Sequence, residues 1–441
     1  MITPENDGVV NREIACAIVP WTNPGDRPNQ DRMDETAGLV EALGCELAFI
    51  RADNVRKPSA SHLLSGGLLD RLAEDAAMHD CSMVIIDSAL SPIQQRNLEL
   101  RLKTKVIDRT GLILEIFGLR ALTKEGILQV ELARQLYERS RLVRTWTHLE
   151  RQRGGGGFLG GPGETQLEAD KRMIDRKVER LKRDLKEVKR TRDVQRAGRR
   201  RGDKPVIALV GYTNSGKSTL FNRLTGADVL AQDMPFATLD PTIRRMDLPN
   251  LGETALVDTV GFITDLPTHL IDSFRATLEE TLDADLIIHV RDRASQSDEE
   301  QKHDVLSVLQ QLSEATGDPL PPIVEAWNKV DLLPDYIQAQ FETQPIDEDI
   351  EEGVAISALT GQGLPNLLAL IERQLGSGRR RVIVQDDTAN GALRAWLYAN
   401  TVIEDEAYDV QGLVTYRAVM SAKEFGQFQA LYPRAEAEVV N

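Results

Sequence analysis

The chain has 441 residues, a net charge of −16 and a hydrophobic share of 41%, which is typical of a soluble protein with about three domains. No apolar run reaches the roughly 18 residues that a membrane-spanning helix needs, and the start, MITPENDGVVNRE, lacks the pattern of a secretory signal. The three cysteines (Cys16, Cys45 and Cys81) are far apart and odd in number, which argues against disulfides or a zinc site. We therefore expect a cytoplasmic protein without a membrane span.

Residues 1–122 predict an N-terminal α/β domain. Strand-like runs at 13–20, 45–50, 82–87 and 105–109 alternate with helix-like stretches at 33–43, 62–78 and 93–102. Alternation at this spacing is typical of a small parallel sheet covered by helices. The first strand is followed by WTNPGD and not by a glycine-rich phosphate loop. This domain is therefore interpreted as a scaffold or docking module.

Residues 123–203 predict a helical hairpin. The first helix runs from Thr123 to about Arg151, and the chain then breaks at residues 154–166, GGGGFLGGPGETQ. The apolar positions of the next helix are spaced by four and three residues, as in a coiled-coil seam: Ile174, Val178, Leu181, Leu185 and Val188. Two helices around one glycine-rich break indicate an antiparallel pair with a flexible tip. The tip has no preceding strand and no GK[ST], so a second phosphate loop is not expected there.

The second hairpin helix is strongly basic. Residues 171–204 contain sixteen Lys or Arg and six Asp or Glu, within an acidic chain. Such a run is either an RNA-binding surface or the solvated face of a coiled coil. The one-sided excess, which ends in GRRRGD at 198–203, favours contact with RNA. The glycines of the tip also permit a close approach to a polyanionic groove.

A phosphate-binding loop is predicted at GYTNSGKS. It follows the apolar run 205–210 and precedes the helix-like segment 219–224, which is the context in which GxxxxGK[ST] binds phosphates. Backbone N–H groups and the helix N-terminus hold the phosphates. The lysine contacts the terminal phosphates, and the hydroxyl binds Mg²⁺. The expected nucleotide-binding residues are Gly211, Tyr212, Thr213, Asn214, Ser215, Gly216, Lys217 and Ser218.

Two further segments follow in the order of a GTPase. MPFATLDPT places Thr238 twenty residues beyond Ser218, where a loop that orders around the terminal phosphate supplies a second hydroxyl to Mg²⁺; Thr242 is the alternative. In DTVGF, Asp258 is expected to hold Mg²⁺ through water, and the Gly261 N–H to contact the γ-phosphate. These segments add as nucleotide-binding residues Phe236, Ala237, Thr238, Leu239, Asp240, Asp258, Thr259, Val260 and Gly261. The expected catalytic residues are Lys217, Thr238 and Gly261.

The base is predicted from NKVD. Asp331 can accept two hydrogen bonds from the guanine N1–H and amino group, which adenine does not offer. Asn328 contacts the base edge, and the stem of Lys329 covers the ring. The turn in VAISALTG directs the Ala358 N–H at guanine O6. The expected base-binding residues are Asn328, Lys329, Val330, Asp331, Ser357, Ala358 and Leu359. Residues 204–376 thus predict a P-loop GTPase domain with a mainly parallel sheet, which binds GTP and GDP and hydrolyses GTP.

One position lacks an expected catalytic side chain. In Ras-like enzymes the residue after the DxxG glycine is a glutamine that orients the attacking water, but here it is Phe262. Phe262 either simply packs against the mobile loop or marks an enzyme that is slow alone and is completed by a partner, which we favour. Arg244, Arg245 and Arg275 are candidates for an in-built arginine finger, although the sequence identifies none of them as such.

Residues 377–441 predict a small α+β module after a linker at 376–381. RVIVQ, a helix at 391–400, strands near Val402 and Gly412 and a helix at 422–431 are expected. The module carries no recognisable chemistry.

These motifs together resemble the HflX family of translation-factor-related GTPases over nearly the whole chain. The resemblance rests on DRTGLILEIF at 108–117, EGILQVELARQLY at 125–137, ERQRGGGGFLGGPGETQLE at 150–168, FATLDPT at 236–242 and DTVGFI at 258–263. It implies the four parts described above, a variable C-terminal module and a hydrophobic residue at Phe262. It also implies binding to the large (50S) ribosomal subunit and its RNA, GTP hydrolysis stimulated there, and the splitting of stalled or idle ribosomes.

Two other functions remain open, a non-ribosomal RNA-binding protein that senses nucleotide with little hydrolysis, and a protein–protein scaffold. We expect a monomer.

Overall fold

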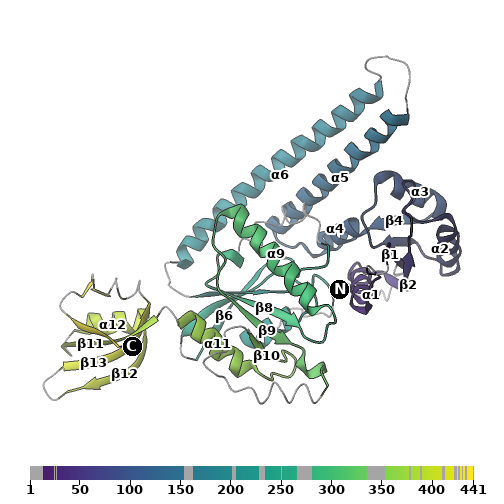
Figure 1. The fold of residues 1–441 in the computed structure, drawn as a ribbon. Coiled ribbons are helices and arrows are strands. Elements are labelled where there is room, and N and C mark those ends of the chain that lie inside the picture. Colours follow the sequence, from purple (N-terminus) through teal and green to yellow (C-terminus); the bar gives the residue numbers. More distant parts are fainter. Residues whose placement is uncertain are drawn as a thin grey trace, which may run out of the picture.

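The computed structural model describes residues 13–440 with gaps at 24, 26, 153–161, 201–204, 228–233, 250, 266–280, 335–352, 377–378, 388–389, 410–412 and at short stretches between 422 and 434. Three sheets and a long helical hairpin make up the described part (Figure 1). The glycine-rich tip, Arg275 and most of the helix expected at 422–431 lie outside it. No helix among the described residues is long and apolar enough to span a membrane.

The N-terminal domain is a parallel four-stranded sheet in the order β2-β1-β3-β4. Its strands are β1 (Ile14–Trp21), β2 (Glu46–Asn54), β3 (Met83–Ile86) and β4 (Lys105–Asp108). Its helices are α1 (Gln30–Ala42), α2 (Gly66–Met78), α3 (Pro92–Leu102) and α4 (Arg109–Arg120). The predicted alternation is confirmed, with α4 as an additional helix that leads into the hairpin.

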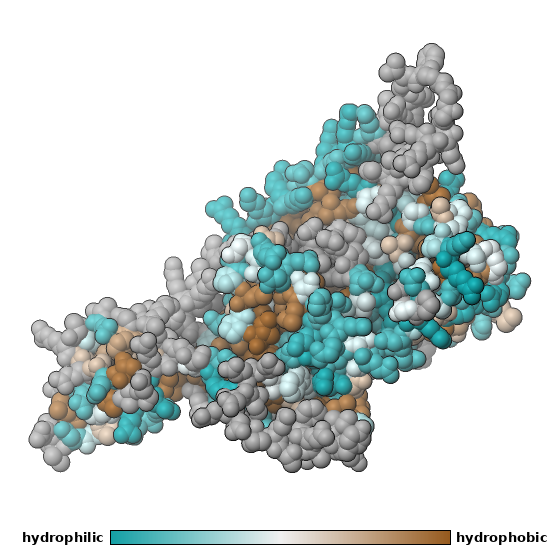
Figure 2. Space-filling view, in the orientation of Figure 1, coloured by the Kyte–Doolittle hydropathy of each residue, from teal (hydrophilic) through white to brown (hydrophobic). Residues whose placement is uncertain are grey.

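The hairpin consists of α5 (Lys124–Gln152) and α6 (Pro162–Arg200). The expected break at 154–166 was too long, because Pro162–Gln166 already belong to α6; a proline suits the first helical position since its missing N–H has no partner there. Four of the predicted apolar positions of α6, Ile174, Val178, Leu181 and Leu185, pack against Leu128, Leu132 and Leu136 of α5. The outer side of α6 is hydrophilic (Figure 2).

The central sheet has six strands in the order β10-β9-β8-β5-β7-β6. They are β5 (Val206–Val210), β6 (Thr242–Leu248), β7 (Gly252–Asp258), β8 (Leu286–Asp292), β9 (Ile323–Asn328) and β10 (Gly353–Ala355), with helices α7 (Lys217–Thr225), α9 (Asp298–Thr316) and α11 (Leu364–Gly376). All pairs are parallel except β6 with β7. Strand β6 was not predicted. Because parallel strands end at one edge, the loops that follow them converge there.

The C-terminal module is an antiparallel sheet in the order β12-β13-β11-β14. It contains β11 (Arg379–Asp387), α12 (Gly391–Asn400), β12 (Val402–Tyr408), β13 (Leu413–Ser421) and β14 (Glu436–Val440). Side chains of α12, including Leu393 and Leu397, complete a small core on one face.

One hydrophobic core joins the N-terminal domain to the central sheet. Leu39 of α1 and Phe117 of α4 share it with Phe236, Leu239 and Val260, which belong to loops of the central sheet. The rings of Phe117 and Phe236 meet edge to face with centroids 4.6 Å apart, an arrangement that adds to the benefit of burial. The two parts are therefore packed together through the loops expected to sense nucleotide.

A buried histidine makes the stability of the central sheet depend on pH. His289 of β8 is 2% exposed, and its Nδ1 has no hydrogen-bond partner among the described residues. Burial lowers its pKa from 6.5 to about 4, against the opposing charge of Glu325. In this window the unfolded chain binds a proton and the folded chain does not, so the free energy of unfolding falls with falling pH, by roughly 3 kcal/mol for the whole shift.

We predict that His289→Val flattens the dependence of calorimetric stability on pH between 4 and 6.5. His303→Val, on the exposed surface of α9, is the matched control. An undiminished slope in the His289 variant would contradict the assignment.

Candidate functional site

The phosphate loop and the base-binding segments meet at the carboxyl edge of the central sheet, around a cavity of about 320 Å³. The cavity is lined by Thr213, Asn214, Gly216, Lys217, Ser218, Thr219, Met234, Phe236, Ala237, Thr238, Thr259, Gly261, Asn328, Lys329, Asp331, Leu332, Ala358 and Leu359. Helix α7 begins at Lys217, directly after the loop, so its N-terminus points its free N–H groups at an anion in the cavity. Segments more than 100 residues apart are brought together as the sequence predicts.

Three oxygen atoms meet at one end of the cavity, two from hydroxyl groups and one from a carboxylate group behind them. Ser218 Oγ lies 3.1 Å from Thr238 Oγ1, and Asp258 Oδ2 lies 2.8 and 2.9 Å from these two hydroxyls. Neighbouring ligands of an octahedral Mg²⁺ are about 2.9 Å apart. Asp258 Oδ1 is buried and has no hydrogen-bond partner among the described residues. The oxygen set therefore fits a divalent cation. Thr242, the alternative hydroxyl, belongs to β6 and pairs with Asp258 along the ladder.

The buried charges of Lys217 and Asp258, at this end of the cavity, only partly compensate each other. Burial lowers the pKa of Lys217 to about 8, against the attraction of Asp258. Burial also raises the pKa of Asp258, against the opposing effect of Lys217 and the two hydroxyls. Lys217 Nζ donates to the carbonyls of Gly211 and Tyr212. A phosphate beside the ammonium group and a cation beside the carboxylate would both favour the charged forms.

The base end is organised around Asn328 at the end of β9. Its Nδ2 donates to Ser215 O at 2.7 Å, and its Oδ1 accepts from the Ala358 N–H at 2.9 Å. One residue thus joins the phosphate loop to the base-binding turn. The expectation for Ala358 needs correction in this structure, because its N–H is directed at Asn328. Lys329 pairs with Asp292 at 2.7 Å.

Some expected nucleotide contacts do not line the cavity. Leu239 and Val260 lie in the core shared with the N-terminal domain, and Asp240 hydrogen-bonds to the start of the hairpin. The Tyr212 hydroxyl is directed at Thr264. These side chains turn away because the loops are covered by the N-terminal domain. Gly211, Ser215, Asp258, Val330 and Ser357 lie behind the lining.

Phe262 is part of the core beneath α9. Its side chain is 3% exposed and packs with Val210, Tyr212 and Val305. Its backbone accepts from the Thr213 N–H and donates to Gly211 O, which ties the DxxG segment to the phosphate loop. Packing thus explains a hydrophobic residue here, and Phe262 offers no group to a water molecule. No arginine lines the cavity within the described ranges; Arg244 and Arg245 are exposed on edge strand β6.

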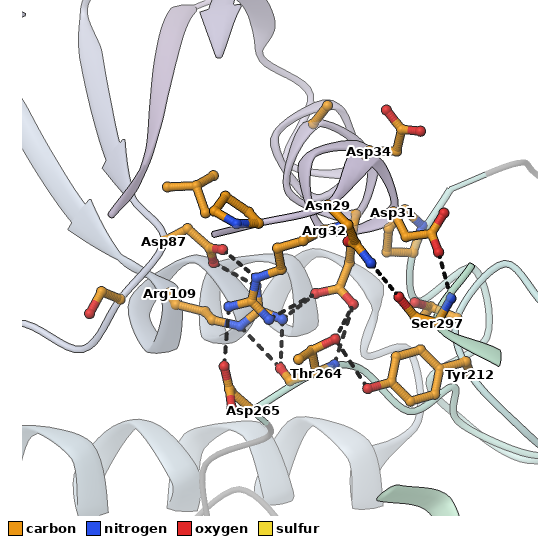
Figure 3. A pocket seen from close by; sticks show the side chains of 18 of the residues that line it. Asn29, Asp31, Arg32, Asp34, Asp87, Arg109, Tyr212, Thr264, Asp265 and Ser297 are labelled. Atoms are coloured by element: carbon orange, nitrogen blue, oxygen red, sulfur yellow. Dashed lines mark hydrogen bonds and ion pairs between the residues drawn. The ribbon is translucent and has the colours of Figure 1, made fainter. Parts of the chain in front are cut away.

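Sequence reasoning missed a clamp from the N-terminal domain on Thr264, two residues beyond Phe262 (Figure 3). Glu35 of α1 accepts from the Thr264 hydroxyl at 2.9 Å and from its N–H at 3.3 Å, while Arg109 donates to the Thr264 carbonyl at 2.6 Å. Arg109 is itself held by Asp87. Burial would raise the pKa of Asp87, but Arg109 and Arg32 outweigh it and lower the pKa. The clamp is therefore charged and fixed.

A second anchor lies beside this clamp. Asp31 accepts from the Ser295 hydroxyl and the Ser297 N–H, and Asn29 donates to the Ser297 hydroxyl at 2.7 Å. Both anchors border a cavity of about 1480 Å³ between the two parts of the protein. The residues that meet across the two parts are 155 to 268 positions apart, so no local pattern could have predicted them.

Gly216 is where the phosphate loop permits no side chain. It has φ +93°, and a Cβ there would lie 2.1 Å from Asn328 Nδ2. We predict that Gly216→Ala weakens GDP binding at least roughly tenfold, since it adds left-handed strain and displaces Asn328. The matched control is Gly226→Ala, with φ +63° and nothing within 4 Å, which should lower stability and leave GDP affinity near wild type. A GDP affinity of Gly216→Ala equal to that of the wild type, measured by calorimetry, would refute the role of Gly216.

Three family models match consecutive parts of the chain: a "GTP-binding GTPase N-terminal" region at residues 30–118, a "GTP-binding GTPase Middle Region" at 120–199 and a "50S ribosome-binding GTPase" at 206–329. The chain is 41% identical to GTPase HflX of Magnetococcus marinus over 413 residues, 93% of each chain. It is 42% identical to GTPase HflX of Escherichia coli over 398 residues, 90% of this chain and 91% of that one.

A crystal structure of SsGBP with GDP aligns to 83% of this chain and 99% of its own, with 25% identity and a TM-score of 0.49. The identity of about 40% to these two proteins named GTPase HflX, over nine-tenths of their length, agrees with the resemblance found in the motifs. The chain belongs to the HflX family of GTPases.

Proposed function

We propose that this GTPase binds the large ribosomal subunit in its GTP state and splits stalled or idle ribosomes in the cytoplasm, acting as a monomer. The observation that carries the proposal is the match of the whole chain to HflX proteins, together with a cavity that joins all the predicted nucleotide segments. The family model over residues 206–329 is described as a 50S ribosome-binding GTPase, which supports this choice of partner.

In the proposed mechanism the N–H groups of the phosphate loop and the Lys217 ammonium group hold the β- and γ-phosphates. A bound Mg²⁺, held by Ser218 and Thr238 with Asp258 behind them, would supply positive charge to the phosphates. The Gly261 N–H contacts the γ-phosphate, and the adjoining segment is fixed by the clamp on Thr264. Water attacks the γ-phosphorus in line as its bond to the β–γ bridging oxygen breaks, so that GDP leaves and inorganic phosphate forms without a covalent intermediate, and the donors stabilise the developing charge.

Phe262 leaves the water without an orienting side chain from its own position. Hydrolysis is therefore proposed to be slow for the free protein and faster on the ribosome, where a group from the partner orients the water. Departure of the γ-phosphate then releases the protein. This cycle requires the GTP state to bind the subunit more tightly than the GDP state.

The hairpin is the proposed contact to ribosomal RNA. Lys182, Arg183 and Lys186 are exposed on α6, and the excess of positive charge continues to its end. Lysine and arginine bind the RNA backbone by releasing its counterions, so binding through this surface must weaken as salt is raised.

We predict that the protein co-sediments with the large subunit in the presence of a non-hydrolysable GTP analogue and reduces the 70S peak. Reversing Lys182, Arg183 and Lys186 to glutamate should weaken binding and lower its salt dependence, by about one unit of slope for each phosphate that is no longer neutralised. Arg381→Glu with Arg417→Glu, on the exposed sheet of the C-terminal module, is the control, with two charge reversals against the three of the hairpin variant.

GTP hydrolysis is the second measurement. Phosphate release over many turnovers is followed with and without large subunits. Stimulation by the subunit is expected. Absence of both co-sedimentation and stimulation would reject the ribosomal function and favour a protein that senses nucleotide with little hydrolysis.

Base selection has its own test. Asp331→Asn replaces an acceptor for the guanine N1–H by an amide donor, so we expect GTP affinity to fall about 100-fold and xanthosine triphosphate to become the preferred ligand. Asp318→Asn, in an exposed turn, is the control. Unchanged GTP affinity in the Asp331 variant, in a fluorescent-nucleotide competition assay, would refute the role of Asp331.

A further inference from the structure

The loop that carries Thr238, residues 234–240, has two functional faces. Thr238 turns toward Ser218 and Asp258 in the nucleotide cavity. The side chains of Phe236 and Leu239, in contrast, are 2% and 3% exposed and pack in the core shared with α1, α4 and α5. Any movement of this loop therefore also moves side chains that pack against the N-terminal domain and against helix α5.

The last residue of the loop, Asp240, contacts the start of hairpin helix α5. Its Oδ2 accepts from the backbone N–H groups of Leu122 and Thr123 at 3.0 and 2.9 Å, and its Oδ1 accepts from the Thr123 hydroxyl at 2.5 Å. The Thr123 hydroxyl also accepts from the Gly126 N–H at 3.0 Å. Thr123 is thus the N-cap of α5, and Asp240 satisfies the donors that the N-cap leaves open.

The sequence of the first turn explains why a distant carboxylate is needed. In a capping box, the third helical residue is a glutamate or glutamine that reaches back to the N–H of the N-cap. In α5 that position is Gly126, which has no side chain. A Cβ at Gly126 would lie 2.4 Å from Asp240 Oδ1. The glycine thus leaves the space into which Asp240 places its carboxylate.

We propose that the capping box of α5 is completed by the nucleotide-sensing loop, which makes Asp240 a positioning residue that couples GTP binding to the hairpin. The inference rests on the proposed role of Thr238 in the GTP state. When GTP draws Thr238 into the cavity, Asp240 caps the hairpin. When the loop is released with GDP, α5 loses its cap and the junction at Leu122 and Thr123 is freed. By linkage, fixing the hairpin must then favour GTP over GDP by the same factor.

The central measurement is hydrogen exchange of the full-length protein, with Mg²⁺ and either GMP-PNP or GDP. In the wild type, peptides that contain the Leu122 and Thr123 amides should exchange roughly tenfold more slowly with GMP-PNP, as a coupling of ordinary size predicts. Equal exchange rates with the two nucleotides would overturn the inference, and this comparison requires no variant to fold.

Two variants separate capping from coupling. Asp240→Ala should expose these amides in both nucleotide states and lower GMP-PNP affinity roughly 5- to 10-fold, with GDP affinity nearly unchanged. Adding Gly126→Glu to that variant builds a capping box within α5 itself. The double variant should therefore protect the Thr123 amide with either nucleotide, while its GMP-PNP affinity stays as low as that of Asp240→Ala. Asp247→Ala, on exposed β6, is the control.

An unchanged ratio of GMP-PNP affinity to GDP affinity in Asp240→Ala would also overturn the inference. Its test uses nucleotides alone, so it is independent of the ribosome experiments. Failure to co-sediment with the large subunit would reject the proposed function and leave the coupling intact, whereas nucleotide-independent exchange would reject the coupling and leave the ribosomal proposal standing.

Discussion

The structure depends on the loop of residues 234–240, whose side chains face two different parts of the protein. The hydroxyl of Thr238 reaches the ligand oxygens of the nucleotide cavity, while Phe236 and Leu239 are buried against helices of another part of the protein. Apolar burial of two such side chains is worth several kcal/mol, and it stabilises the loop against the N-terminal domain. The hydrogen bonds add direction, since they determine which residue faces the cavity and which faces the hairpin.

The nucleotide site contains two buried charged groups that are not fully compensated without a ligand. Lys217 and Asp258 are both deeply buried, and burial shifts the pKa of each toward its neutral form. The clamp on Thr264 is the reverse case, because Asp87, Arg109 and Glu35 compensate one another. The compensated network around Thr264 therefore holds the segment that carries Gly261 and Phe262. Lys217 and Asp258, in contrast, are stabilised in their charged forms when phosphate and a cation bind.

Local chemistry in the sequence predicted the elements and the residues around the cavity. Ser218, Thr238 and Asp258 converge, because Ser218 follows the loop after β5, Asp258 ends β7, and Thr238 lies in the loop that leads into β6 at the same edge of the sheet. The sequence could not predict the side chains that turn away, such as Leu239, Val260 and Asp240, since their partners come from the N-terminal domain and the hairpin. Strand β6 was missed because TIRRMDL has charged residues and only two buried ones, Met246 and Leu248, so its alternation is weak. The contact between Glu35 and Thr264 depends on how the N-terminal domain packs against the central sheet. The spacing of apolar residues in the sequence does not reveal that packing.

The shared core has a consequence for how the chain is made. Leu39, Ile113 and Phe117 are synthesised early, yet part of their covering comes from Phe236, Leu239, Val260 and Ile263. At about 5–20 residues per second, synthesis from Phe117 to Ile263 takes on the order of 10–30 seconds. During that interval the nascent N-terminal domain has an uncovered apolar face beside α4. The order of synthesis therefore leaves this face in need of protection from aggregation until the phosphate-loop half has emerged.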